Sequence, residues 1–269
     1  NCSISYINLM KGLRYRINGK AKKDLQQRIT LYLQPKKNNM KNLIIFGIFI
    51  LTLVFAQFAQ AQTVDEIVNK YIDALGGKEK LSALKSVRLE GNLNVQGTDV
   101  SIIITKLHMK GMRMDISVMG TDNYQVVTPE KGIMFMPIQG MASPTDMPDE
   151  LLKPGQTQLD IQSSLLDYKE KGSTVELLGT EGTDYKLKLT YKNAVVTTMF
   201  IGQKDYHLNK TISKRNINGE EIDFETTYSN YKQNAEGYWF PYTSTNMQGE
   251  TNYDKIETNI AVDEGIFKG

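Results

Sequence analysis

The sequence has little of the chemistry on which most enzymes depend. Its 269 residues include one cysteine, Cys2, and two histidines, His108 and His207. A lone cysteine forms no disulfide within its own chain. The two histidines are far apart in the sequence, and neither lies in a metal-binding spacing. We therefore expect a protein with no metal and no cofactor.

Motifs for nucleophilic catalysis and phosphate binding are missing as well. The chain has neither a G-x-S-x-G elbow nor a glycine-rich phosphate loop. Glu220 and Glu221 are adjacent carboxylates, but neighbours on a strand point to opposite faces, so a solvated hairpin edge explains them better. We expect no enzyme, although an active site assembled from scattered residues stays open as an alternative.

A short export signal lies inside the chain. Met40 begins a positively charged start, residues 43–55 are an almost unbroken apolar run, and residues 59–61 read Ala-Gln-Ala. This order is typical of a secretory signal peptide. The apolar run is shorter than the roughly 20 residues that span a bilayer. We predict cleavage near Ala61-Gln62 and a periplasmic product.

The position of this signal predicts how the chain is divided. A signal peptide works at the amino terminus, so residues 1–39 are expected to lie upstream of the true start and not to be translated. Residues 40–61 are then the signal peptide and residues 62–269 a single domain. A signal anchor with a basic cytoplasmic tail is the alternative. No cysteine follows the cleavage site, so we expect no lipid anchor.

Removal of the first 61 residues changes the sign of the net charge. They hold ten of the 32 Lys and Arg residues and one of the 30 Asp and Glu residues, which leaves 22 basic and 29 acidic residues and a charge of −7. An acidic protein offers no electrostatic footprint for nucleic acid or for anionic membrane surfaces. Nucleic acid is therefore excluded as an expected partner.

The expected domain opens with a helix and continues as strands. Thr63 and Glu66 form a capping box, and apolar residues recur at helical spacing until Gly76-Gly77. From Ser86 onward the apolar period changes to two, as in antiparallel strands with one apolar face. We expect about eleven strands in a large curved sheet or barrel.

One interval breaks this alternation. Residues 137–166 begin with a proline, contain three more, and hold two short apolar patches. The interval is too long for a hairpin loop, and such segments are usually functional or mobile. We predict a loop with one or two short helices, a lid over an opening of the sheet.

Methionines gather next to the same interval. Eight of the twelve lie between residues 109 and 147. Methionine is flexible and polarizable and suits surfaces that adapt to apolar partners. Ordinary core packing and a ligand cavity both stay open, with copper binding as a remote third alternative. The same choice between packing and cavity applies to the aromatic residues 238–242, which include Trp239.

Several segments resemble the outer-membrane lipoprotein-sorting (LolA/LolB-like) superfamily. They run through nearly the whole expected domain: residues 63–68, 74–77, 84–91, 166–172, 185–188, 228–232, 237–241 and 256–267. The resemblance implies a mainly β fold, with a half-open, strongly curved antiparallel β-barrel, an N-terminal helix and a loop-helix lid over the concave face. These motifs are structural rather than catalytic, so they indicate the fold better than the activity. The chain resembles a divergent member of the superfamily.

The resemblance also implies a function. In that superfamily an apolar cavity shelters acyl chains of a lipoprotein between a membrane-complex donor and an outer-membrane acceptor, so we expect a monomeric, non-enzymatic carrier or binder of lipidated or apolar ligands. An arginine near the lid has a role in such carriers, and Arg88 and Arg113 are the early-strand candidates. A protein-interaction or envelope-sensor module, with the lid at residues 140–166 as its recognition surface, is the alternative. The residues predicted to line the apolar cavity are Leu89, Leu93, Ile102, Ile104, Met112, Met114, Ile116, Met134, Met136 and Trp239.

Overall fold

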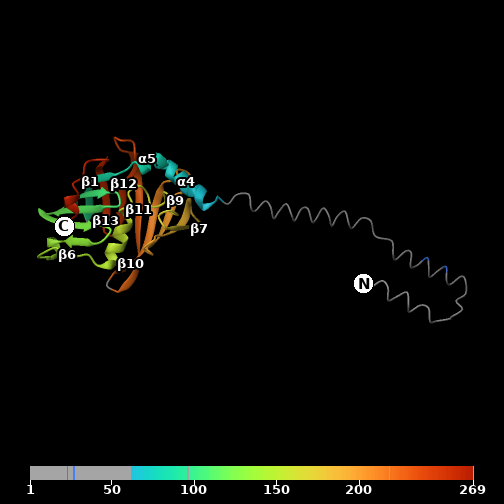
Figure 1. Ribbon diagram of the computed structural model, residues 1–269. Coiled ribbons are helices and arrows are strands. Elements are labelled where there is room, and N and C mark those ends of the chain that lie inside the picture. Colours follow the sequence, from blue (N-terminus) through green and yellow to red (C-terminus); the bar gives the residue numbers. More distant parts are fainter. Residues whose placement is uncertain (1–22, 24–26, 28–61, 96, 218, 269) are drawn as a thin grey trace. The chain divides into compact units, whose positions relative to one another are not determined.

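Thirteen antiparallel strands form one curved sheet in the computed structural model of the chain (Figure 1). The structure describes residues 62–95, 97–217 and 219–268, together with Lys23 and Gln27. The predicted signal peptide and nearly all of the segment before it lie outside the described residues. Within the described ranges, no helix is both long enough and apolar enough to cross a membrane.

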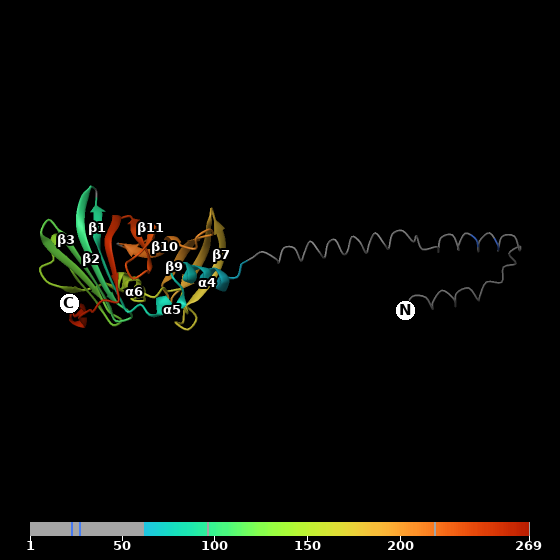
Figure 2. The ribbon, with the colours of Figure 1, turned by 90° about the horizontal axis from the view of Figure 1, so that it is seen from above.

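The sheet is open, because its first and last strands do not pair with each other. The strand order is β6-β5-β4-β3-β2-β1-β13-β12-β11-β10-β9-β8-β7. Figure 2 shows the strands turning around the side on which the helices lie. The strands are β1 (Ser86–Val95), β2 (Thr98–Leu107), β3 (Gly111–Val118), β4 (Thr121–Val127), β5 (Gly132–Phe135), β6 (Thr145–Asp146), β7 (Thr174–Glu181), β8 (Asp184–Thr190), β9 (Val196–Gly202), β10 (Leu208–Ile217), β11 (Glu220–Gln233), β12 (Trp239–Asn246) and β13 (Gly249–Thr258).

The predicted mainly β, curved antiparallel architecture is confirmed. The structure has thirteen strands in place of the expected eleven or so. One strand that the alternation could not indicate is β6, which has two residues and pairs with β5 inside the proline-rich interval. A strand this short contains too few positions for a period of two to be visible.

Helix α4 (Val64–Ala74) begins as its sequence predicts. The N–H of Glu66 donates to the Thr63 hydroxyl over 3.2 Å, and the N–H of Thr63 donates to the Glu66 carboxylate over 3.0 Å. These two bonds satisfy amide groups that lack a partner at a helix start. The other helices of residues 62–268 are the short α5 (Lys78–Ser82), α6 (Asp149–Thr157) and two 3-10 turns, η1 (Pro137–Gln139) and η2 (Glu264–Phe267).

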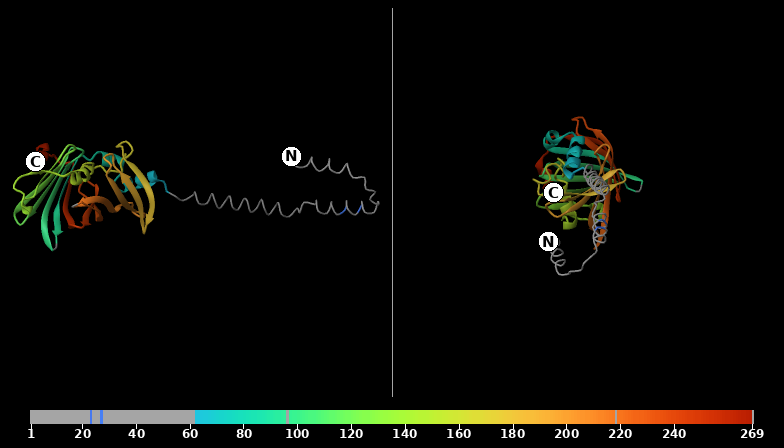
Figure 3. Two further views of the ribbon diagram at one scale, coloured as in Figure 1. Left: turned by 90° about the horizontal axis from the view of Figure 1, so that it is seen from below. Right: turned by 90° about the vertical axis from the view of Figure 1, so that its right-hand side faces the viewer.

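Strand register defines an inner face of the sheet. Leu89 lies opposite Ile104, and Ile104 lies opposite Met114, so these side chains share a face. The same face continues through β13, β12, β11 and β10 to Met199 and Leu187. We call it the inner face, because the helices cover it (Figure 3).

The covering elements divide the core into two main parts. Helix α4 packs its apolar stripe on β8 and β9, together with Leu165 and Leu166. Residues of the proline-rich interval pack on β2 and β3. A smaller cluster of Leu84, Val87, Tyr238 and Ile256 lies between β1, β13 and β12.

A β-bulge in the centre of the sheet requires glycine. The register of β1 against β13 shifts between Glu90 and Gly91. A Cβ on Gly91 would lie 2.1 Å from the carbonyl oxygen of Asn252, which is closer than atoms approach. The bulge sharpens the local twist where the sheet curves.

Candidate functional site

Residues 140–166, the lid segment, cover the apolar inner face of β2 and β3. Met147 and Leu159 are 7% and 1% exposed, and with Leu152 they pack against Ile102, Ile104 and Met112. Gly132 leaves room for this contact, since a Cβ there would lie 2.8 Å from the Met147 Cβ. The predicted loop with a short helix is therefore folded onto the sheet.

Several polar bonds fasten the lid segment to the rest of the domain. The N–H of Met109 donates to the carbonyl of Leu159 over 2.9 Å, and the N–H of Met147 to that of Gly132 over 2.9 Å. The Gln162 amide donates to the carbonyl of Leu84 over 3.0 Å. Each such bond is worth about 0.5–1.5 kcal/mol net. Further bonds join Gln156 to the carbonyl of Pro129 over 2.8 Å and Tyr191 to the hydroxyl of Ser164 over 3.1 Å.

Eight of the ten predicted lining residues lie on the inner face of neighbouring strands. Ile102 and Ile104 are buried, at 5% and 6% exposure, as is Met112 at 6%. Met136 is buried just beyond β5, at the start of η1, and Trp239 packs with the α4 cluster at the other end of the sheet. The eight residues of the shared face are Leu89, Leu93, Ile102, Ile104, Met112, Met114, Ile116 and Met134.

The two arginines predicted to contact the lid point to the other face. Arg88 and Arg113 alternate with Leu89 and Met112, so they lie on the outer face. Arg88 Nε pairs with Glu90 at 2.7 Å. Arg113 Nε pairs with Asp115 at 2.8 Å, while its guanidinium donates to the carbonyl of Ile266 and stacks on Tyr124. Successive residues of a strand point to opposite faces, and the lid segment lies on the inner face. The structure therefore does not bring either arginine to the lid segment.

Buried and partly buried tyrosines add hydroxyl groups to the interior. Burial raises the pKa of Tyr71 and Tyr253 to about 12. Tyr231 donates its hydroxyl to the carbonyl of Leu208 over 2.9 Å, and its ring stacks on His207 at 4.1 Å. The Tyr228 hydroxyl lies 3.3 Å from that of Thr211. These groups stay protonated at neutral pH and give the interior hydrogen-bonding capacity without charge.

Charge is scarce on the inner face, and the charges present were not predicted. Lys106 occupies the inner-facing position after Ile104 on β2, between Val87 and Met112 on the flanking strands. Burial lowers its pKa to about 8. The sequence carried a signal, since Lys106 continues the apolar alternation of β2 with a charged residue.

A polar cluster joins the lid segment to its surroundings near its C-terminal end. Asp160, 11% exposed at its side chain, pairs with Lys171 at 2.6 Å and lies 3.8 Å from Nδ1 of His108. That nitrogen is buried and has no hydrogen-bond partner among the described residues. Burial lowers the pKa of His108, an effect that Asp160 opposes and Lys171 reinforces.

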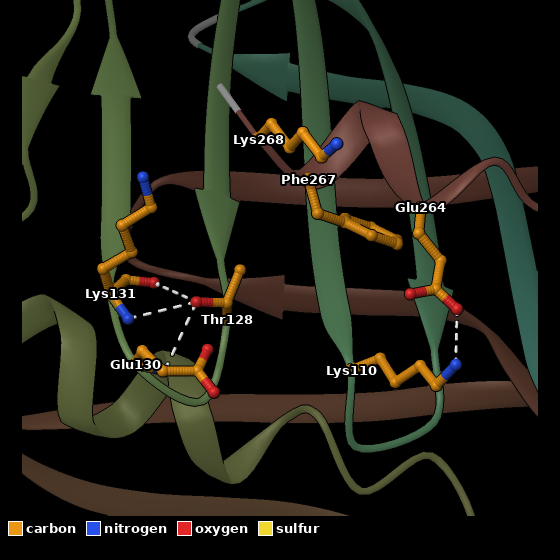
Figure 4. A pocket seen from close by; sticks show the side chains of 7 residues that line it. All are labelled: Lys110, Thr128, Glu130, Lys131, Glu264, Phe267 and Lys268. Carbon is orange, nitrogen blue, oxygen red and sulfur yellow. Dashed lines mark hydrogen bonds and ion pairs between the residues drawn. The ribbon is translucent and has the colours of Figure 1, made fainter.

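A cavity of about 430 Å³ lies away from the inner face (Figure 4). It is formed where η2 rests on the outer side of β3, next to the turn between β4 and β5. Phe267 packs there against Gly111, and Lys110 pairs with Glu264. Thr128, Glu130, Lys131 and Lys268 complete the lining. Its mixed charges do not suit an apolar ligand. In the described ranges, no three His, Cys, Asp or Glu side chains gather as a metal site.

Together the sheet and the lid segment define a class: a half-open antiparallel β-barrel whose apolar inner face is covered by helices. A LolA superfamily protein from Nitrosomonas europaea shares this fold with 13% identity and a TM-score of 0.51, over 78% of this chain and 99% of that one. The predicted LolA-like resemblance is thereby confirmed for the fold.

Two further solved structures align with lower scores. A putative outer membrane lipoprotein-sorting protein domain from Vibrio parahaemolyticus aligns with 16% identity and a TM-score of 0.39, over 76% of this chain and 95% of that one. The MucA/MucB complex of Pseudomonas aeruginosa aligns with 10% identity and a TM-score of 0.28, over 75% of this chain and 60% of that one. No family model and no curated protein matches the sequence.

Proposed function

We propose that the protein is a non-enzymatic periplasmic carrier or binder of lipidated or otherwise apolar ligands. One observation carries this proposal: a largely apolar inner face on β1 to β3 is covered by a lid segment rather than by a second sheet or a long helix. Ligand uptake requires the lid segment to leave, so that acyl methylenes replace Met147, Leu152 and Leu159. Each buried CH₂ contributes about 0.8 kcal/mol, so burial of an acyl chain of moderate length compensates for the apolar contacts that the lid segment loses.

The LolA-like fold supports the same proposal. A lipoprotein or another acylated molecule is the expected ligand, handed from a membrane donor to an outer-membrane acceptor by a monomer. The export signal at residues 40–61 supports the periplasmic location. The proposed binding residues are the predicted lining residues.

Native mass spectrometry tests this function. The full chain is expressed with its export signal, and the protein is purified in the form in which it accumulates and then extracted with organic solvent. We expect co-purifying acyl species, lost when Met114 of the inner face is replaced by Glu. Met119→Glu is the matched control, because Met119 is 89% exposed at a hairpin tip. A protein that stays empty when challenged with lipids and lipopeptides contradicts the proposal.

A second candidate function is a protein-interaction or envelope-sensor module on the same scaffold. Two observations favour it: the inner face is filled by lid side chains, and apolar side chains remain exposed on and beside the lid segment. Ile138 is 47% exposed and Leu151 is 40% exposed. In this case the protein stays free of lipid in the experiment above, and Leu151→Asp weakens a protein complex without changing stability.

A further inference from the structure

The strongest unexplained feature of the inner face is a cation with no counterion. Inner-facing positions of β1 to β5 carry no Asp or Glu, and Lys106 is the single charged residue among them. Within the described residues its ammonium group has no carboxylate and no hydrogen-bond acceptor. Lys106 itself is partly exposed, and its neighbours on the inner face, Val87, Ile104 and Met112, are 3–6% exposed.

Such a group destabilises a protein unless something compensates it. Removing a lysine ammonium from water costs several kcal/mol, and a native interior normally provides a paired carboxylate. Residues 62–269 have an excess of acidic side chains, so carboxylates were available to pair with Lys106. Perturbed and unpaired ionisable groups of this kind concentrate at functional sites.

We propose, building on the function above, that Lys106 binds the anionic headgroup of an amphiphilic ligand whose acyl chain lies on the inner face. The ligand is an acyl chain that ends in a carboxylate or a phosphate. A bound anion replaces the missing counterion of Lys106 and forms a charge-assisted hydrogen bond in a place of low dielectric constant.

The position of Lys106 on its strand sets the orientation of this ligand. Lys106 is the last inner-facing residue of β2, next to the turn where Met109 holds Leu159 of the lid segment. From Lys106 the apolar face runs back along β2 through Ile104 and Ile102, about 13 Å away at the rise of a strand. The chain therefore lies beneath the lid segment, with its headgroup at the end where the lid is fastened.

Arg215 is a second observation that favours an anionic ligand on the inner face. It lies on the inner face of β10, since Thr211 of that strand is opposite Met199. Its Nε is buried and has no hydrogen-bond partner in the described part of the chain, and its guanidinium lies 3.4 Å above the ring of Phe224. Within the described residues the inner face thus carries two cations without a carboxylate partner, and it offers anions a favourable potential.

The test compares ligands that share one chain length and differ in the headgroup. Dodecanoate, dodecyl phosphate and uncharged dodecanol are titrated below their micellar concentrations at pH 7 into the protein purified as above, and affinity is measured by calorimetry. Four proteins are compared: wild type, Lys106→Met, Lys106→Arg and Lys204→Met. Lys204 is an exposed lysine of the turn after β9 and serves as the charge-matched control.

We expect the wild type to bind at least one anionic ligand about tenfold or more tightly than dodecanol, as a hydrogen bond to a charged group predicts. Lys106→Met is expected to remove this preference while dodecanol binding persists. Lys106→Arg and Lys204→Met are expected to keep it. The better of the two anions identifies a carboxylate or a phosphate headgroup.

Two results overturn the inference in different ways. If dodecanol binds as tightly as both anions, or if the preference survives in Lys106→Met, the headgroup assignment is wrong while the proposed apolar-ligand function stands. If none of the three ligands binds the wild type, the proposed function fails and the inference fails with it.

Discussion

Nδ1 of His108 lies 3.8 Å from Oδ1 of Asp160, beneath the point where the lid segment meets the turn between β2 and β3. The separation is too long for a hydrogen bond and short enough for attraction once the imidazole is protonated. Burial nevertheless dominates and lowers the pKa of His108. The lid segment is thus held next to the His108 imidazole, which is harder to protonate than a histidine in water.

This arrangement predicts a loss of stability in mild acid. Because the pKa of His108 is lower in the folded than in the unfolded protein, the unfolded chain binds more protons as the pH falls through about 6.5. We expect the free energy of unfolding to decrease between pH 7 and pH 5, and His108→Gln to reduce that slope. Urea unfolding followed by circular dichroism measures it.

Carboxylates provide the contrast for this experiment. Hydrogen bonds from cationic partners lower the pKa values of Asp65, Glu90 and Glu181, so their contribution is lost below about pH 4.5. If the free energy of unfolding falls equally between pH 7 and pH 5 in the wild type and in His108→Gln, the loss of stability does not come from His108.

Lys106→Met is expected to stabilise the ligand-free protein at pH 7 by about 1–3 kcal/mol, since one pKa unit corresponds to about 1.4 kcal/mol. The pKa of Lys106 falls from 10.5 to about 8 on folding, so the unfolded chain binds more protons between these values. The destabilisation of the wild-type protein by charged Lys106 is complete below pH 8 and disappears as the pH rises towards 10.5.

Urea unfolding at pH 7 and at pH 10.5 distinguishes this effect from a change in packing. The gain from Lys106→Met is expected to shrink at the higher pH, and Lys204→Met to lie within about 0.5 kcal/mol of wild type at both. A Lys106→Met protein less stable than wild type at pH 7 would falsify the account of an uncompensated interior cation.

Leu159→Ala is expected to cost about 2–5 kcal/mol, the usual range for removal of a buried leucine side chain. Leu159 is 1% exposed and joins the lid segment to the β2 and β3 cluster. Chemical denaturation gives the free energy of unfolding, and limited proteolysis reports whether the lid segment becomes cleavable. Leu151→Ala, at a 40% exposed position on α6, is the matched control and should change stability by no more than about 0.5 kcal/mol.

A disulfide across β5 and β6 is expected to hold the lid closed. Ile133 and Asp146 lie directly opposite each other in this pair. Opposed residues of antiparallel strands are about 4.5–5.5 Å apart at Cα, which suits a disulfide. With Cys2 changed to serine, the Ile133→Cys/Asp146→Cys protein should take up dodecanol more slowly when oxidised than when reduced. Stopped-flow displacement of a fluorescent apolar probe measures the rate, and equal rates in both states contradict lid opening as the route of entry.

Local patterns predicted much of this fold because they report local physics. The capping box of Thr63 and Glu66 and the period-two alternation of β3 depend on residues that are close in sequence. The two-residue strand β6 could not be predicted, since its pairing with β5 depends on a tertiary contact across the lid segment. Arg88 and Arg113 were grouped with the lid by a family resemblance, although their own alternation with Leu89 and Met112 assigns the opposite face.

The sequence by itself determined the strand-forming face, the leading helix and the proline-rich interruption, because the periods of apolar residues and the turn chemistry are properties of short segments. Only the tertiary structure decided which face is covered, that Met147, Leu152 and Leu159 fill it, and that Lys106 lies on it with no carboxylate partner among the described residues. Burial and pairing depend on strand register and on which distant segments meet across the sheet, and no local pattern fixes these contacts.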